Sequence, residues 1–500
     1  MKPIFTRLPK QARNAGVLLH ISSLPSADLG DDAYRFVDFL AETGASVWQT
    51  LPLNMPHDDG SPYQCLSAHA GNPAFICLER LVEDNLLKPS SLQANRDVAL
   101  NDAYSQYKHS KNQTLQNEFI KFCSENVAWL GDFACFLVLR KKFKHHNWNT
   151  WPTPYKNKQP AAMKQLKQRN AYAIGVIKFS QFLFFKQWHM LKTYANKKSI
   201  AMFGDIPIFV AYDSADVWAK PHFFKLDKHK NMQVVAGVPP DYFSANGQRW
   251  GNPHYHWPKM QASGFSWWLG RMRTQSRLFD LLRIDHFRGL ESAWEIPAHA
   301  ETAIDGAWVL APGDALLKEI KQKLPHLQLI AEDLGVITDE VNALRAKYNL
   351  PGMKILQFAF GDDDTNPYLP HNIDENSVVY TGTHDNNTTL GWWQQQNERT
   401  QQYAKSYMSK LAKDMQFEMT PVEITTAKIP QCLIALALST KANMAIIPLQ
   451  DILGLDSAHR MNTPGTIENN WQWKFDWLQL QTAHISYFKQ ALKSSKRSQL

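Results

Sequence analysis

Eight short hydrophobic runs divide the chain, and most are separated by enough residues for a helix. Each run is nearly continuous in hydrophobicity, which is typical of parallel strands buried on both faces. The runs cover residues 16–21, 47–51, 200–205, 281–285, 327–332, 354–358, 378–383 and 443–448. Eight strands that alternate with helices predict a (β/α)8 TIM barrel, an α/β fold whose active site forms at the carboxyl ends of the strands.

The longest intervals follow the second and third predicted strands. The first of them contains two helical patterns, at roughly 114–145 and 170–196. No change in composition marks a boundary within either interval. We therefore expect one catalytic barrel domain over residues 1–500, with insertion subdomains at 60–195 and 210–275 around the rim of the active site.

Composition narrows the class of protein. Hydrophobic residues make up 44% of the 500 residues and charged residues 20%, which excludes a disordered or collagen-like chain. The net charge of +8 is compatible with nucleic-acid binding. However, the lysines and arginines lie in short scattered runs without interleaved aromatic residues, so we favour a solvated basic surface.

The cysteines and the N-terminus suggest a cellular compartment. The five cysteines show no CxxC spacing, which is typical of reduced thiols in the cytosol. The basic N-terminus lacks the apolar region and cleavage site of a signal peptide. The longest apolar stretch, near residues 432–438, is far shorter than a membrane span. We therefore expect a soluble, cytoplasmic protein that does not bind membranes.

Three acidic residues stand where predicted strands end. Asp285 closes the fourth strand, Glu332 closes the fifth, and Asp385 follows the seventh. Retaining glycosyl transfer needs one ionised carboxylate to attack the anomeric carbon and a second carboxyl to protonate the leaving oxygen, about 5–5.5 Å away. Neighbouring strands lie about 4.8 Å apart. The pattern therefore predicts glycosyl transfer, with Asp285 and Glu332 as the reacting pair.

Two basic residues accompany these acids. Arg283 lies two positions before Asp285 on the same predicted strand, so both side chains share one face and we expect Arg283 to hold Asp285 ionised. His384 precedes Asp385 and is suited to binding sugar hydroxyls. Two alternatives stay open. The acids could be paired with arginines for stability alone, or they could form a metal site, although no HxH or HExxH spacing accompanies them.

Two segments combine aromatic rings with amides, as sugar-binding surfaces do. Residues 58–64 follow the second strand, and residues 239–253 are rich enough in Gly and Pro to predict a loop. We interpret both as binding surfaces, with aromatics tucked under the loop as the alternative.

Other motifs are interpreted as structural or are absent from the sequence. The pairs Trp267-Trp268 and Trp392-Trp393 are predicted to be core residues because apolar neighbours follow both. The sequence has no Gly-x-Ser-x-Gly elbow, Walker A loop or Rossmann fingerprint, which excludes those classes of enzyme.

At these residues the chain resembles the 4-α-glucanotransferases (amylomaltases or disproportionating enzymes), glycoside hydrolase family 77 of the α-amylase clan. The ordered matches run along nearly the whole chain. They are residues 16–25, 61–64 with 71–73, 204–208, 238–243, 283–289, 331–335, 383–386 and 460–462 with 464–465. Two departures are Asn387, where Asp is usual, and Asn246, where Thr is expected.

The resemblance implies roles for individual residues. Asp285 would be the nucleophile, Glu332 the general acid/base and Asp385 the stabiliser of the transition state. The implied sugar-binding residues are Tyr63, Asp205, Arg283 and His384 on the donor side, and Tyr242, Phe243, Gln248 and Trp250 on an acceptor-side flap. We also assign His286 and Asn462 to substrate binding.

The expected reaction moves an α-1,4-glucan segment from a maltooligosaccharide to the 4-hydroxyl of an acceptor glucan or glucose, through a covalent glycosyl-aspartate. Maltooligosaccharides, amylose or glycogen-derived glucans and glucose are the expected partners, and the protein is expected to be a monomer or weak homodimer. This chemistry needs no cofactor or metal. The alternatives are a hydrolase of the same clan, a catalytically silent glucan-binding protein and a nucleic-acid-binding protein.

Overall fold

The computed structural model describes the chain except residues 1–12, 241–243, 362, 415–423, 467 and 500. Eight parallel strands form its centre. They are β1 (Asn14–Leu18), β2 (Val47–Gln49), β3 (Ala201–Pro207), β6 (Leu281–Asp285), β9 (Gln328–Ala331), β10 (Gly352–Ile355), β11 (Ser377–Tyr380) and β12 (Met444–Pro448). All eight strands predicted from the hydrophobic pattern are present.

The strands close into a barrel. Their order is β10-β11-β12-β1-β2-β3-β6-β9, and every pairing within that sheet is parallel. The N–H of Ala331 donates a hydrogen bond of 2.9 Å to the carbonyl of Pro351, which joins the two ends of the sheet. Apolar side chains such as Phe203, Ile330 and Ile446 fill the interior. The predicted TIM barrel is confirmed.

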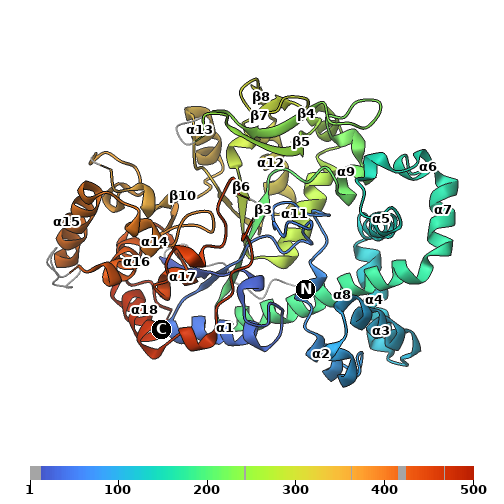
Figure 1. The fold of residues 1–500 in the computed structure, drawn as a ribbon, viewed down its shortest axis with the longest axis horizontal. Helices are drawn as coiled ribbons and strands as arrows, with labels where there is room; N and C mark the ends of the chain where they lie inside the picture. Colours follow the sequence, from blue (N-terminus) through green and yellow to red (C-terminus); the bar gives the residue numbers. More distant parts are fainter. Residues whose placement is uncertain (1–12, 241–243, 362, 415–423, 467, 500) are drawn as a thin grey trace.

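Helices surround the barrel (Figure 1). Among those that pack on its strands are α1 (Asp31–Thr43), α8 (Ala171–Lys197), α11 (Ser266–Leu278) and α16 (Ile429–Ser439). Helix α1 shows why these helices pack on the barrel. Its apolar residues recur at helical spacing on one face and are buried; they include Ala33, Phe36, Val37 and Leu40. The helix ends where Gly44 adopts φ +83°, a left-handed conformation that glycine tolerates.

The remaining helices lie in the intervals that follow β3 to β12 or in the interval after β2. The former are α9 (Ala215–Ala219), α10 (Trp257–Ala262), α12 (Gly313–Lys323), α13 (Asp339–Lys347), α14 (Thr389–Gln394), α15 (Glu398–Asp414), α17 (Leu449–Ile452) and α18 (Thr482–Ser494). The latter are α2 (Leu78–Glu83), α3 (Arg96–His109), α4 (Gln113–Glu125), α5 (Leu130–Lys142), α6 (Thr153–Lys156) and α7 (Pro160–Arg169). Figure 1 shows α3–α7 gathered to one side of the barrel.

A second sheet lies beside the carboxyl ends of the barrel strands. It is antiparallel, in the order β5-β4-β7-β8, and consists of β4 (Val234–Val238), β5 (Gln248–Pro253), β7 (Ser292–Pro297) and β8 (Ala307–Leu310). The prediction of a loop over residues 239–253 is wrong for its second half, which is β5. The sequence of this edge strand contains Gly and Pro and lacks a strand pattern. Its extended conformation is determined by its pairing with β4.

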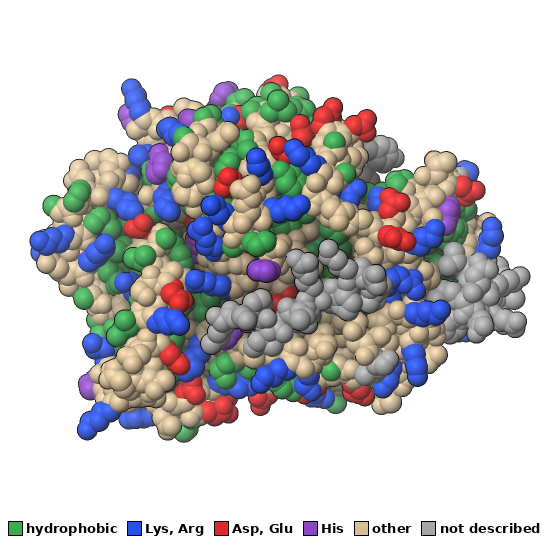
Figure 2. Space-filling model, turned by 180° about the vertical axis from the view of Figure 1, so that it is seen from behind, with side chains coloured by type: hydrophobic (Ala, Val, Ile, Leu, Met, Phe, Trp, Pro, Cys, Tyr) green, Lys and Arg blue, Asp and Glu red, His purple; other side chains and the backbone are tan. Residues whose placement is uncertain are grey.

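Several sequence predictions concern burial and charge. Trp267, Trp268, Trp392 and Trp393 are all buried, as expected of core residues. All five cysteines are free thiols. Figure 2 shows Lys and Arg side chains dispersed among acidic ones over the face it displays. Within the described residues, no individual helix combines the length and apolar composition needed to cross a membrane; α4 and α5 do so only when counted together, and the chain bends by 91° between them.

Candidate active site

A cleft of about 550 Å³ opens at the carboxyl ends of the barrel strands. Its walls come from the ends of β6 and β9, from β5, and from the loops that follow β2, β3, β10, β11 and β12. The sequence-predicted residues that line it are Tyr63, Gln248, Trp250, Arg283, Asp285, His286, Glu332, Asp385 and Asn462. Asp205 and His384 contact Tyr63, one of these lining residues, from behind. Tyr242 and Phe243 lie outside the described residues.

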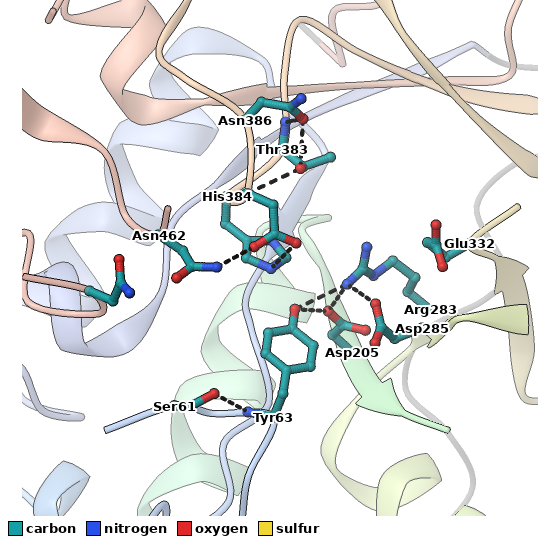
Figure 3. A network of polar contacts seen from close by, with 12 residues as sticks. Ser61, Tyr63, Asp205, Arg283, Asp285, Glu332, Thr383, His384, Asn386 and Asn462 are labelled. Atoms are coloured by element: carbon teal, nitrogen blue, oxygen red, sulfur yellow. Dashed lines mark hydrogen bonds and ion pairs between the residues drawn. The ribbon is translucent and has the colours of Figure 1, made fainter. Parts of the chain in front are cut away.

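Arg283 is the centre of the polar network (Figure 3). Its Nη2 donates to Asp205 at 2.6 Å and to Asp285 at 2.9 Å. The same nitrogen donates to the Tyr63 hydroxyl at 3.0 Å. The strand register explains this arrangement, because Asp205 on β3 pairs directly with Arg283 on β6, and Asp285 follows Arg283 on the same face. The guanidinium and the Asp205 carboxylate are buried, whereas Asp285 is 31% exposed to the cleft.

The ionisation of Asp285 depends on opposing influences. Burial, together with the nearby carboxylates of Asp205, Glu332 and Asp385, raises its pKa well above the ordinary value. Arg283 acts in the opposite direction and favours the ionised form. The sequence predicted the ion pair between Arg283 and Asp285, but not that one guanidinium is divided between two aspartates. Because the Arg283 guanidinium is divided between Asp205 and Asp285, it offsets less of the rise in the pKa of Asp285 that burial causes.

Glu332 directly follows β9 and is held by backbone amides. The N–H of His286 donates to its Oε2 at 2.6 Å, and the N–H of Leu334 donates to its Oε1 at 3.1 Å. Both bonds and the charge of Arg283 favour the carboxylate, but burial outweighs them and raises the pKa of Glu332 to about 7. Near neutral pH this carboxyl therefore exists in both protonation states, which suits a group that gives and takes one proton.

Asp385 lies across the cleft on the loop after β11. Its Oδ1 accepts a hydrogen bond of 2.6 Å from the Asn462 amide, and its Oδ2 lies 3.3 Å from His384 Nε2. Arg460 donates to its backbone carbonyl at 2.8 Å. The His384 ring stacks on Tyr63, with centroids 5.2 Å apart and an interplanar angle of 11°. The Tyr63 hydroxyl in turn donates to Asp205 at 2.6 Å. Asp385 is thereby linked to the Arg283 network.

Strand β5 of the second sheet forms another wall of the cleft. Trp250 on β5 meets the His286 ring edge to face, with centroids 4.8 Å apart, and its Nε1 donates to Gln248 at 3.1 Å. Asn252 and Gln64 exchange amide hydrogen bonds of 3.1 and 3.3 Å, which join β5 to the loop that carries Tyr63. A flat aromatic face beside amides is suited to the apolar and hydroxyl faces of a sugar.

Some cleft residues were missed by sequence reasoning. Trp471 lies 5.9 Å from both Tyr63 and His384, measured between ring centroids, in the segment after β12. Phe358 lines the cleft at the end of the 3-10 turn that follows β10. Their sequence signal was weak, since each is a single aromatic residue outside the polar motifs. Within the described residues, one trio of potential metal ligands lies close together, Asp28, Cys77 and Glu79, and none of these lines the cleft.

Comparison with known proteins agrees with this geometry. The family model of glycoside hydrolase family 77, described as 4-alpha-glucanotransferase, matches residues 19–480. The chain is 43% identical to the 4-alpha-glucanotransferase of Synechocystis sp. (95% of this chain, 97% of the relative) and 42% identical to that of Thermus thermophilus (92% and 94%). Amylomaltase from Streptococcus agalactiae, solved in complex with acarbose, superposes with a TM-score of 0.91 at 34% identity, over 97% of this chain and all of that one. The chain therefore belongs to glycoside hydrolase family 77, the family of 4-alpha-glucanotransferases that its motifs indicated, and shares their activity.

Proposed function

We propose that this 4-alpha-glucanotransferase works by double displacement, with Asp285 as the nucleophile and Glu332 as the general acid/base. The observation that carries the proposal is the position of these two carboxyls in one cleft, at the ends of the paired strands β6 and β9. The amide of the residue after Asp285 donates to Glu332, which links the two groups directly.

In the first step, Asp285 attacks the anomeric carbon of an α-1,4-linked donor while Glu332 protonates the departing oxygen. The donor segment is then held as an ester on Asp285, and the released fragment leaves the acceptor side. In the second step, ionised Glu332 removes the proton from the 4-hydroxyl of an incoming glucan or glucose, which attacks the ester. The pKa of about 7 allows Glu332 to perform both tasks near neutrality.

Asp385 is our candidate for stabilising the positive charge that develops at the anomeric centre, and Asn462 and His384 hold its carboxylate. Tyr63 and Asp205 belong to the donor site in this proposal. Arg283 supports both Asp205 and Asp285 through its shared guanidinium.

The acceptor side is assigned to Gln248, Trp250 and His286, together with Tyr242 and Phe243 of the preceding segment. Transfer exceeds hydrolysis only when an acceptor sugar occupies this side and water is excluded. The aromatic wall formed by Trp250 and His286 supports that bias.

We further propose maltooligosaccharides, amylose or glycogen-derived glucans and glucose as substrates. The amylomaltase from Streptococcus agalactiae was solved in complex with acarbose, which supports an oligosaccharide as the ligand of this chain. A single catalytic domain with insertion subdomains at 60–195 and 210–275, and a monomer or weak homodimer, complete the proposal. The five free thiols support a cytoplasmic location.

The assignment is tested by product analysis and by trapping. Pure maltotriose should yield glucose together with longer oligosaccharides, whereas glucose and maltose alone would indicate a hydrolase. With maltotriosyl fluoride as donor, fluoride departs without a proton, so Glu332→Gln should accumulate a maltotriosyl ester on the peptide that contains Asp285. Asp285→Asn in the same background should carry no label. A label on Asp385 instead would overturn the nucleophile assignment.

A further inference from the structure

His286, which directly follows Asp285, has an unusual backbone conformation. His286 adopts φ 55° and ψ 52°, the left-handed region that side-chain-bearing residues rarely enter. A 3-10 turn, Phe287–Leu290, follows it directly. Strained backbone of this kind persists only where the surrounding structure determines it, and it is found often at active sites.

Hydrogen bonds on both sides account for the turn. The N–H of Glu332 donates to the carbonyl of Ile284 at 3.0 Å, and the N–H of Phe287 donates to the carbonyl of Glu332 at 3.0 Å. Between them, the N–H of His286 donates to the Glu332 carboxylate at 2.6 Å. Residues 284–287, which include Asp285, therefore form hydrogen bonds with the amide, the carbonyl and the side chain of Glu332.

We propose, on the basis of the proposed function, that His286 is a positioning residue for Glu332: the left-handed turn at 286 aims its backbone N–H at the carboxylate and fixes the general acid/base against the nucleophile loop. An extended or right-handed backbone at this position would turn the peptide before His286 relative to the peptide after it, so the N–H groups of His286 and Phe287 could not both donate to Glu332. The role belongs to the backbone of His286, and its ring has a separate one.

The ring does not contribute a charge to Glu332. Burial lowers the pKa of His286 to about 3, so the imidazole is neutral at neutral pH. The ring lies edge to face with Trp250, and within the described residues its Nε2 has no hydrogen-bond partner. Replacing the ring is therefore expected to alter acceptor binding, whereas changing the backbone preference is expected to alter Glu332.

The groups that surround Glu332 determine how its titration responds. Arg283 and the amides of His286 and Leu334 favour the ionised form, and burial opposes it. Acidic neighbours oppose it as well. The titratable and charged groups that face it are Arg283 and Asp285 on β6, the adjacent Asp333 and the phenol of Tyr368. Loss of one donated N–H leaves the others in place, so the pKa of Glu332 should rise.

The test uses three substitutions of the full-length protein that all remove the ring. His286→Gly accepts the left-handed turn, His286→Ala accepts it poorly, and the β-branched His286→Val disfavours it strongly. The measurement is the pH dependence of kcat/KM for maltotriose disproportionation, whose basic limb reports the protonated general acid. The wild-type limb is expected near pH 7.

His286→Gly should keep the wild-type limb and change mainly the KM for the acceptor. His286→Val should move the limb to higher pH by about half a unit or more and lower kcat roughly tenfold or more. If the valine variant does not fold, the comparison of Ala with Gly decides, since only Ala should move the limb upward. The proposal would be overturned if the basic limb of kcat/KM lay at the same pH in all variants, or if it shifted in His286→Gly as far as in His286→Val.

Glu332→Gln separates this outcome from a failure of the proposed function. If the basic limb survives in Glu332→Gln, Glu332 is not the general acid, and the assignment of the mechanism fails. If the limb disappears there but does not move in the valine or alanine variant, only the positioning role of His286 fails.

Discussion

The carboxylate of Asp205 and the guanidinium of Arg283 face each other across β3 and β6 at 2.6 Å, and both side chains are almost completely buried. Arg283 also contacts Asp285, so the charge of Asp205 affects the nucleophile without touching it. Asp205 raises the pKa of Asp285, and it competes for Arg283, which lowers that pKa.

We therefore predict that Asp205→Asn lowers the pKa of Asp285. The asparagine oxygen can still accept from Tyr63 and Arg283, but the negative charge is gone. The acidic limb of kcat/KM should move to lower pH by about one unit, because Asp285 ionises more easily. The free energy of unfolding should fall by about 2 kcal/mol, since Arg283 loses its ion pair with Asp205 and keeps the one with Asp285.

Asp280→Asn provides the matched control. Asp280 is a largely buried aspartate at the other end of β6, 3.0 Å from Lys192. Its substitution should reduce stability and leave the acidic limb in place. An acidic limb that stays fixed or moves upward in Asp205→Asn would contradict the predicted coupling.

The raised pKa of Glu332 predicts a pH-dependent cost in stability. The pKa is about 7 in the folded chain and 4.5 in an ordinary environment, so the folded state holds its proton more tightly. Stability is therefore lost as pH rises from about 4.5 to 7 and is not lost further above that range. Glu332→Gln removes this cost and should raise the free energy of unfolding at pH 8 by about 3 kcal/mol.

Urea denaturation at a series of pH values measures the difference between wild type and Glu332→Gln, which should vanish below about pH 4.5. Glu83→Gln, at an exposed position on α2, should show no such dependence. A difference that is constant with pH would mean that the Glu332 carboxyl titrates normally in the folded chain.

Trp250 is predicted to favour transfer over hydrolysis. Removing its ring in Trp250→Ala opens the wall beside His286. It also frees Gln248, whose side-chain oxygen accepts a hydrogen bond from the indole in the wild-type protein. The ratio of transfer to hydrolysis on maltotriose should fall roughly tenfold, because a sugar acceptor loses its stacking partner while water does not. Trp308→Ala, on the edge strand β8 outside the cleft, should leave the ratio unchanged. An unaltered ratio in Trp250→Ala would remove β5 from the acceptor site.

The hydrophobic pattern was sufficient for the barrel because each strand is buried on both faces and carries its own signal. The strand ends then placed Asp285, Glu332 and Asp385 in one cleft, and the two-residue period placed Arg283 beside Asp285. These predictions depend on short-range regularities. The assignment of the donor and acceptor residues came from resemblance to the family instead.

Features that depend on distant partners were not predictable in the same way. Strand β5 owes its conformation to β4, and Trp471 reaches the cleft from a segment without regular structure. The left-handed turn at His286 is set by bonds to Glu332, which lies 46 residues further along the chain. In each case the determining contact is made in the folded molecule, so the local sequence shows little of it.

The last prediction concerns the amino end of the barrel, opposite the cleft. Arg497 is fully buried and donates to the carbonyls of Asn14, Leu438, Thr440 and Ala442, which lie at the starts of β1 and β12 and the end of α16. Burial lowers its pKa to about 9, so it remains protonated at neutral pH.

Arg497→Met should fill the space but remove the Arg497 donor from the carbonyls of Asn14, Leu438 and Ala442, whereas the Thr440 carbonyl still accepts from Arg13 at 2.7 Å. We expect a cost of about 3 kcal/mol in the free energy of unfolding. Arg497→Lys should recover little of the loss, because a single ammonium cannot match the fork of the guanidinium. The exposed neighbour Lys493→Met serves as the control and should be nearly neutral. Since Arg497 lies far from the strand ends that carry Asp285 and Glu332, kcat at 25 °C should be preserved in every variant that remains folded. A large fall in kcat without a fall in stability would show that this end of the barrel communicates with the cleft.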